Sequence, residues 1–154
     1  NGNTFIGFDD LVGGSNVPNG YRNINWNNAV AYTNSYAVSG YNTGTISKNN
    51  TSYNSGASSM TMTRVGSTLF TLYSVAIAAA WNDNLQLSVI GYRSSAVIAS
   101  STFTLQVLSV SNIVFSGFTA LDTAVFSTSG GTTNPTVSGS GLHYAMDNLC
   151  VTVA

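Results

Sequence analysis

The sequence predicts an all-β fold, a two-sheet antiparallel β-sandwich that is jelly-roll-like, and three observations lead to it. Residues typical of helices are scarce, because the chain has no Glu, one Lys and two Gln. Several short segments alternate apolar and small polar residues with the period of two that a half-buried strand requires. Turn-forming Asn and Gly residues separate these segments. Its 154 residues suffice for one core, so we expect a single sandwich domain over residues 1–154.

Nine segments are predicted as strands. Alternation marks 58–64, where Met alternates with Thr, and 85–92, where Leu and Val alternate with Gln and Ser. A long apolar run that ends in Trp81 defines 68–81. The others are rich in β-branched and aromatic residues. In chain order the predicted strands are 4–8, 29–33, 58–64, 68–81, 85–92, 96–105, 112–118, 120–127 and 144–153.

Turns are expected between the strands, where Asn and Gly tolerate left-handed backbone angles. The stretch 18–54 is rich in Asn and Tyr and has a weaker strand signal, so it should form long surface loops around short strands. Binding sites on a sandwich usually lie in such loops. The turn-rich segments are 13–16, 18–20, 81–84 and 129–141.

The chain carries very little charge. Nine of its residues are charged and the net charge is −1, whereas Ser, Thr, Asn and Gly number 22, 18, 18 and 15. A typical soluble domain is about a quarter charged, and charge keeps like molecules apart in solution. We therefore expect this surface to associate with copies of the same chain unless glycan covers it, so the expected partners are further copies and glycans.

Other classes of protein are excluded by composition. The longest apolar run, 75–81, is far shorter than the roughly 20 residues that span a bilayer, so no membrane span is expected. The basic residues are scattered singly, whereas binding a nucleic-acid backbone needs clustered cations. The only cysteine, Cys150, is expected to be a buried structural thiol. Asn1 is interpreted as a mature N-terminus left after signal removal, or else as an arbitrary boundary.

The five acidic residues, all Asp, give two chemical alternatives. Hydrolysis of a glycosidic bond needs two facing carboxylates, but these lie in turn and strand-edge contexts, and His143 has no triad or metal-spaced partner in sequence. The chain is therefore expected not to be an enzyme, and no catalytic residue or resident cofactor is assigned. If the terminal strands pair, Asp10 and Asp147 could share a structural calcium ion, which takes six to eight oxygen ligands. The alternative is that both accept backbone N–H groups.

A possible sugar-binding group lies in the first long loop. Tyr21, Arg22, Asn25 and Trp26 combine aromatic rings, which stack on sugars, with side chains that bond hydroxyl groups. The alternative is that Trp26, like Trp81, fills the core.

Two overlapping N-glycosylation sequons occupy 49–52, with acceptors at Asn49 and Asn50. Their polar surroundings predict an exposed loop that carries sugar in a glycosylating organism. The similar sequence at Asn134 is not a glycosylation sequon, because Pro135 follows the asparagine.

Both ends of the chain resemble a known family. The motifs are Phe8-Asp9-Asp10-Leu11, Val17-Pro18-Asn19-Gly20-Tyr21, Asn25-Trp26, Ala80-Trp81-Asn82-Asp83, Ser129-Gly130-Gly131-Thr132 and His143-Tyr144-Ala145-Met146-Asp147-Asn148-Leu149. Together they resemble secreted β-sandwich domains of bacterial surface proteins with C-terminal sorting tails and of extracellular proteins of microbial eukaryotes. The resemblance implies a jelly-roll-like fold similar to carbohydrate-binding modules, an extracellular location and no established catalytic role.

The leading hypothesis is a secreted, glycosylated structural protein that assembles with itself into an extracellular fibre, coat or matrix. The alternative is a carbohydrate-binding module or adhesin domain that uses its loop aromatics. A glycan-active enzyme is a third, weaker hypothesis. A binding module should be monomeric and bind a polysaccharide, whereas a structural subunit should form large particles.

Overall fold

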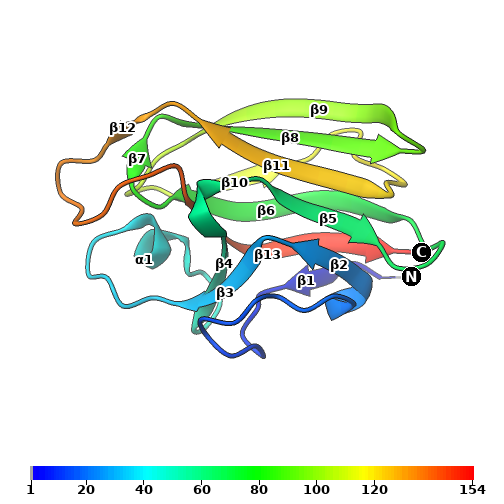
Figure 1. Cartoon of the computed structure of the whole chain (residues 1–154), viewed down its shortest axis with the longest axis horizontal. Helices are drawn as coiled ribbons and strands as arrows, with labels where there is room; N and C mark the ends of the chain where they lie inside the picture. Colours follow the sequence, from blue (N-terminus) through cyan, green and yellow to red (C-terminus); the bar gives the residue numbers. More distant parts are fainter. Residues whose placement is uncertain (1) are drawn as a thin grey trace.

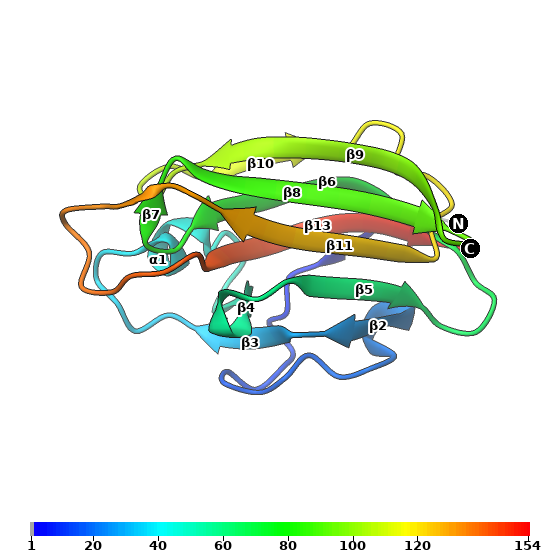
Figure 2. The ribbon, with the colours of Figure 1, turned by 45° about the horizontal axis from the view of Figure 1, so that its top comes forward.

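The computed structural model describes residues 2–154, and two antiparallel sheets pack face to face in it (Figures 1 and 2). The first sheet has the order β10-β6-β13-β4-β3, and β1 pairs with β13 beside β4. Its strands are β1 (Thr4–Ile6), β3 (Ala29–Thr33), β4 (Asn50–Asn54), β6 (Phe70–Ala79), β10 (Ser111–Val114) and β13 (Tyr144–Val153).

The second sheet has the order β2-β5-β11-β8-β9. Its strands are β2 (Ile24–Asn27), β5 (Met60–Arg64), β8 (Leu85–Arg93), β9 (Ala96–Leu105) and β11 (Thr123–Ser129). A small ribbon joins β7 (Asn82–Asp83) to β12 (Thr132–Thr133), and the helical turns are η1 (Tyr21–Asn23), α1 (Gly40–Gly44) and η2 (Ser55–Ala57). The predicted all-β sandwich is therefore confirmed.

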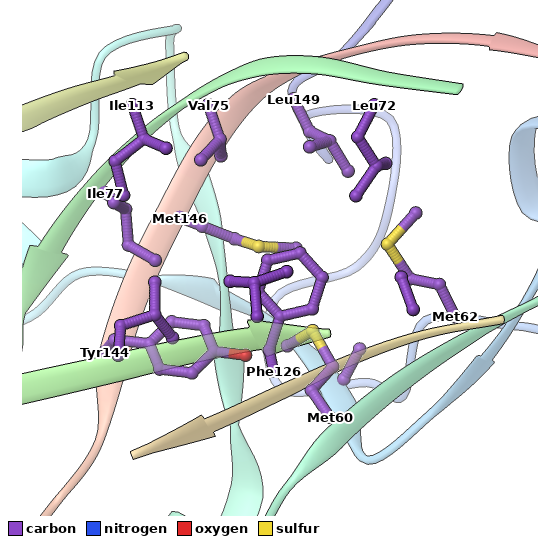
Figure 3. Close-up of a cluster of buried hydrophobic side chains, with 14 of the residues drawn as sticks. Met60, Met62, Leu72, Val75, Ile77, Ile113, Phe126, Tyr144, Met146 and Leu149 are labelled. Atoms are coloured by element: carbon purple, nitrogen blue, oxygen red, sulfur yellow. The ribbon is translucent and has the colours of Figure 1, made fainter. Parts of the chain in front are cut away.

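The core lies between the sheets and follows from the alternation. Met60 and Met62 of β5 are fully buried, while Thr61 and Thr63 between and beside them face outward. Figure 3 shows these methionines with Phe126, Tyr144 and side chains of the first sheet in one cluster. Fully burying a large apolar side chain stabilises the fold by roughly 1.5–3 kcal/mol, so this interior supplies most of the driving force.

A second, aromatic cluster lies on the outer face of the first sheet. Tyr41 of α1 packs edge-on against Trp81 with ring centroids 5.5 Å apart, and Tyr32 and Tyr53 complete the cluster. Trp81 is 6% exposed, so it is buried as the alternative interpretation held, but it packs in this outer cluster and not in the core between the sheets. Helix α1 can lie this close because its first residue is Gly40, where any Cβ would collide with the backbone of Ala79.

The structure differs from the predicted strands chiefly within 18–54. That stretch contains β2, which alternates Ile and Trp with Asn over only four residues, and β4, which carries mainly polar residues and shows no hydrophobic alternation. In β4 the polar residues Asn50, Thr51, Ser52 and Asn54 are buried. The predicted strand 112–118 ends at Val114, and the segment after it packs Phe115 and Phe118 into the core.

The two ends of the chain meet in the first sheet, as expected for the terminal strands. Phe5 of β1 lies opposite Cys150 of β13, and Ile6 lies opposite Leu149. Cys150 is 3% exposed, in agreement with a buried thiol. None of the helices within residues 2–154 combines the length and the apolar character needed to cross a membrane.

Candidate functional site

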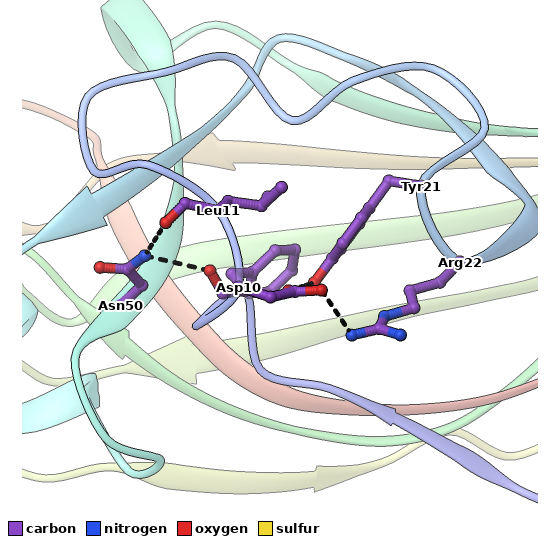
Figure 4. Close-up of polar contacts among 6 residues, drawn as sticks. Asp10, Leu11, Tyr21, Arg22 and Asn50 are labelled. Atoms are coloured by element: carbon purple, nitrogen blue, oxygen red, sulfur yellow. Dashed lines mark hydrogen bonds and ion pairs between the residues drawn. The ribbon is translucent and has the colours of Figure 1, made fainter.

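The loop that follows β1, residues 7–11, carries two of the five carboxylates and connects the predicted sites. Figure 4 shows Asp10 with its partners Tyr21 and Arg22. The Asp10 carboxylate accepts a hydrogen bond from Tyr21 Oη at 2.6 Å. It also forms an ion pair with Arg22, whose Nη2 lies 2.8 Å from Asp10 Oδ2. Burial, together with the bond to Asp10, raises the pKa of Tyr21 to about 12, so the phenol is a donor at neutral pH. Because Asp10 and Arg22 are about half exposed, their ion pair contributes less than about 1 kcal/mol.

The turn that carries Arg22 is conformationally strained. Arg22 has φ 54° and Asn23 has φ 61°, a left-handed region that non-glycine residues avoid. Two bonds hold the turn: Asn25 Oδ1 accepts the backbone N–H of Gly20 at 3.0 Å, and Trp26 Nε1 donates to the carbonyl of Tyr21 at 3.1 Å. Asn25 therefore positions this loop, and its amide group also reaches the carbonyl of Arg64.

Trp26 is not available to stack on a sugar. Its side chain is 6% exposed and meets Phe8 edge to face with centroids 5.7 Å apart. Tyr21 stacks on the same Phe8 ring and is half-buried. The alternative that Trp26 fills the core is confirmed, and its place in an exposed sugar-binding group is corrected: the ring closes the end of the core, because β2 turns its apolar side inward.

The buried carboxylate of the site is Asp147 in β13, which is 0% exposed. Its Oδ2 accepts the backbone N–H groups of Ile46 and Ser47, each at 2.7 Å, and its Oδ1 accepts that of Asn148 at 2.7 Å. The Ser47 hydroxyl lies 2.9 Å from Oδ1. Burial raises the pKa of Asp147 even though these donors oppose the shift.

Asp9, rather than Asp10, binds the same segment 46–50 as Asp147. Asp9 Oδ1 accepts the backbone N–H groups of Asn49 and Asn50 at 2.8 and 2.9 Å. Burial by itself would raise the pKa of Asp9, but bonds from Ser47 and from these amides lower it below its usual value. Gly7 permits the convergence, because a Cβ there would lie 2.7 Å from Ser47 Oγ. The two carboxylates thus fasten the segment 46–50 to β13 and to the loop 7–11.

The proposed calcium pair is consequently divided between two clusters. Asp10 bonds Tyr21 and Arg22, while Asp147 bonds Ile46 and Ser47. Within residues 2–154 no three His, Cys, Asp or Glu side chains gather as a group that could hold a metal ion. Both carboxylates accept protein donors, and the calcium ion suggested for Asp10 and Asp147 stays untested.

The two sequons differ in accessibility. Asn50 begins β4, is 3% exposed and donates Nδ2 to the carbonyls of Phe8 and Leu11 at 3.0 and 2.8 Å (Figure 4). The nitrogen that would carry the sugar is therefore occupied and enclosed in the folded chain. The side chain of Asn49 is exposed. The expectation of an exposed acceptor is thus corrected for Asn50, whose amide instead closes the loop 7–11, and is retained for Asn49.

A feature that the sequence did not identify is the free edge of the second sheet. Strand β9 pairs with β8 through nine residue pairs and one register shift between Gly91 and Tyr92, and no other strand of the described chain pairs with its far side. It contains no charged residue and no proline, and Val97 near its start is 59% exposed. Native sheets usually guard such edges with Lys, Pro or a covering loop. The absence of charge within 96–105 was the available signal, but its position at the edge depends on the sheet order.

The outer face of the first sheet also exposes apolar side chains. Phe5, Ile46 and Val114 are 65%, 49% and 74% exposed, and they surround a hollow of ≈ 180 Å³ floored by Val75 and Ala76. Isolated exposed apolar residues are ordinary, whereas this group gathers side chains from three separate segments around one hollow.

Comparison with known proteins informs the fold alone. No family model matches the sequence, and no curated protein matches it. Among solved structures, a DUF4465 family protein from Bacteroides caccae is similar, with a TM-score of 0.68 at 10% sequence identity. The match covers 99% of this chain and 99% of that chain, so the same β-rich architecture extends over the whole length of both.

Proposed function

We propose that this protein is a secreted, glycosylated structural subunit without catalytic activity, which assembles with copies of itself into an extracellular fibre, coat or matrix. The observation that carries the proposal is the free edge of β9, a ten-residue strand with no charge and no proline. Such an edge pairs readily with a strand of a second molecule.

Strand addition at β9 is favoured by backbone chemistry. Each hydrogen bond between strands contributes about 0.5–1.5 kcal/mol net, and the exposed side chain of Val97 adds apolar contact. Little Coulomb repulsion opposes the contact, since nine charges are distributed over the whole chain. The association should therefore persist at high salt, where contacts that depend on charge weaken.

Propagation into a filament needs a second contact on each molecule. The apolar group of Phe5, Ile46 and Val114 lies on the other sheet, so it is separate from β9. Two different contacts that do not close on themselves generate an open chain of molecules. We include in the proposal an extracellular location, as the family resemblance implies, and N-linked sugar at Asn49, whose side chain faces solvent.

The proposed assembly is tested with two matched substitutions. Thr104→Lys places a charge on the edge strand β9, and Thr61→Lys places the same charge on β5, which has neighbours on both sides. We expect the first to reduce particle size in light scattering and electron microscopy of native material, and the second to leave it unchanged. The proposal is wrong if unsubstituted native protein, never exposed to denaturant, is a monomer at physiological salt.

The carbohydrate-binding alternative is weakened in its original form. It relied on loop aromatics, but Trp26 is enclosed and Tyr21 and Arg22 already bond Asp10. The outer face of the second sheet offers different chemistry, with uncharged polar side chains held on neighbouring strands.

A further inference from the structure

The outward side chains of the second sheet form rows that run across its strands. Met60, Met62, Ala124 and Phe126 are fully buried, so the residues between them point away from the core. One row follows the strand register from Asn25 to Thr63, Thr123 and Tyr92. The next row contains Asn27, Thr61, Val125, Ile90 and Ser100. Neither row contains a charged residue.

Most polar groups of these rows are free to bind a ligand. Within residues 2–154 no hydrogen bond uses the hydroxyl groups of Thr61, Thr63, Thr123 or Tyr92, and none uses the side-chain amide of Asn27. Each of these residues is at least partly exposed. Because β-strands hold them at fixed spacing, their donors and acceptors are ordered before any ligand arrives.

Two hollows of ≈ 530 and ≈ 500 Å³ lie over this part of the face, and Thr63 lines both. The first is bounded by Tyr92, Asp122 and Arg64, and the second by Asn25, Asn27 and Thr61. We call the two hollows with their shared wall the trough. Asp122 Oδ2 accepts the backbone N–H of Ser94 at 2.6 Å, which fixes this carboxylate and leaves its other oxygen available.

We propose that the trough binds a neutral saccharide chain that crosses the strands of the second sheet. Sugars present apolar C–H faces and many hydroxyl groups that both donate and accept hydrogen bonds. The trough matches this with the Tyr92 ring, three threonine hydroxyl groups and the side-chain amide of Asn27. Stacking on an aromatic ring and hydrogen bonds from well-placed polar groups are the usual means of holding such a ligand.

The low charge of the trough favours a neutral saccharide over other classes of ligand. Arg64 and Asp122 are the charged residues lining the trough, and they have opposite sign. A nucleic-acid strand would require several cations along its path. The apolar residues Val125 and Ile90 are flanked by polar neighbours in their row, so the face lacks the continuous apolar centre typical of a protein interface. A neutral, hydroxyl-rich polymer needs neither a row of cations nor a continuous apolar centre.

The test uses the native protein and three immobilised neutral polysaccharides as probes: β-glucan, mannan and chitin. We expect at least one to retain the protein, and Tyr92→Ala to weaken retention about tenfold, which corresponds to about 1.4 kcal/mol. Tyr73→Ala is the matched control, because Tyr73 is a similarly half-exposed tyrosine on the first sheet. It should bind like the unsubstituted protein.

Two further variants separate this proposal from self-assembly. Thr61→Lys fills the trough but leaves the β9 edge intact, so it should abolish saccharide binding and preserve particles. Thr104→Lys should do the reverse. The saccharide site is refuted if the protein is retained by none of the three probes at saturating density. Equal binding by Tyr92→Ala, Thr61→Lys and the unsubstituted protein would also refute it, whatever the assembly measurements show.

Discussion

Replacing Tyr144 with Phe should stabilise the protein. The Tyr144 side chain is fully buried in the core cluster with Met60 and Phe126 (Figure 3), and its hydroxyl has no hydrogen-bond partner in the described chain. An unpaired buried hydroxyl costs about 1–3 kcal/mol of stability. Tyr144→Phe removes that group and leaves the ring in place, so the loss of packing is small.

We take the lower end of the range, because removing the oxygen also removes its van der Waals contacts. The free energy of unfolding should then rise by about 1 kcal/mol, which for a chain of this size raises the melting temperature by about 2–4 °C. Circular dichroism during thermal unfolding measures the shift. Tyr73→Phe is the control, since that hydroxyl is on the surface and lies 3.3 Å from Thr152 Oγ1.

Alkaline pH gives an independent readout. Burial raises the pKa of Tyr144 far above the ordinary 10.0. Above pH 10 the unfolded chain therefore releases this proton while the folded chain retains it, so stability falls as pH rises, by about 1.4 kcal/mol per pH unit. The Phe variant lacks this contribution, and its advantage should widen above pH 10. A variant that melts several degrees lower at pH 7 would refute the reasoning, because it would mean that the hydroxyl has a stabilising partner.

Three further predictions follow from the polar clusters. Asp147→Ala should lower the free energy of unfolding by about 3 kcal/mol in urea denaturation, because it leaves three partly buried backbone N–H groups without their acceptor. Asp10→Ala should lower it by less than about 1 kcal/mol, and equal losses for the two variants would contradict the assignment. Removing calcium with a chelator should leave the melting temperature unchanged, because protein donors already bond both oxygens of Asp147. A fall in the melting temperature that added calcium reverses would establish a calcium site. Burial lowers the pKa of His143 below 6.5, so the unfolded chain binds a proton at a higher pH than the folded chain, and the free energy of unfolding should fall as pH drops through 6.5. His143→Gln should reduce this dependence of stability on pH, and an unchanged dependence would exclude His143 as its source.

The sequence by itself determined the fold class and most strands, because strand periodicity is a local property. Alternation in 58–64 and 85–92 identifies which residues face the core without knowledge of their neighbours, and β5 and β8 follow it. The scarcity of Glu and Lys similarly excluded long helices. Polar strands escaped this reasoning: β4 was predicted as part of a loop, since its buried Asn and Ser residues are stabilised by bonds to distant segments.

Only the tertiary structure decided which polar residues are available at the surface. Asn49 and Asn50 are adjacent and chemically identical, yet one faces solvent and the other closes the loop 7–11. Asp9 and Asp10 diverge in the same way, because successive side chains point in different directions and each meets a segment far away in sequence. The edge position of β9 and the row from Asn25 to Tyr92 likewise depend on sheet order and register. Those features arise from pairing between strands distant in sequence, which no local pattern encodes.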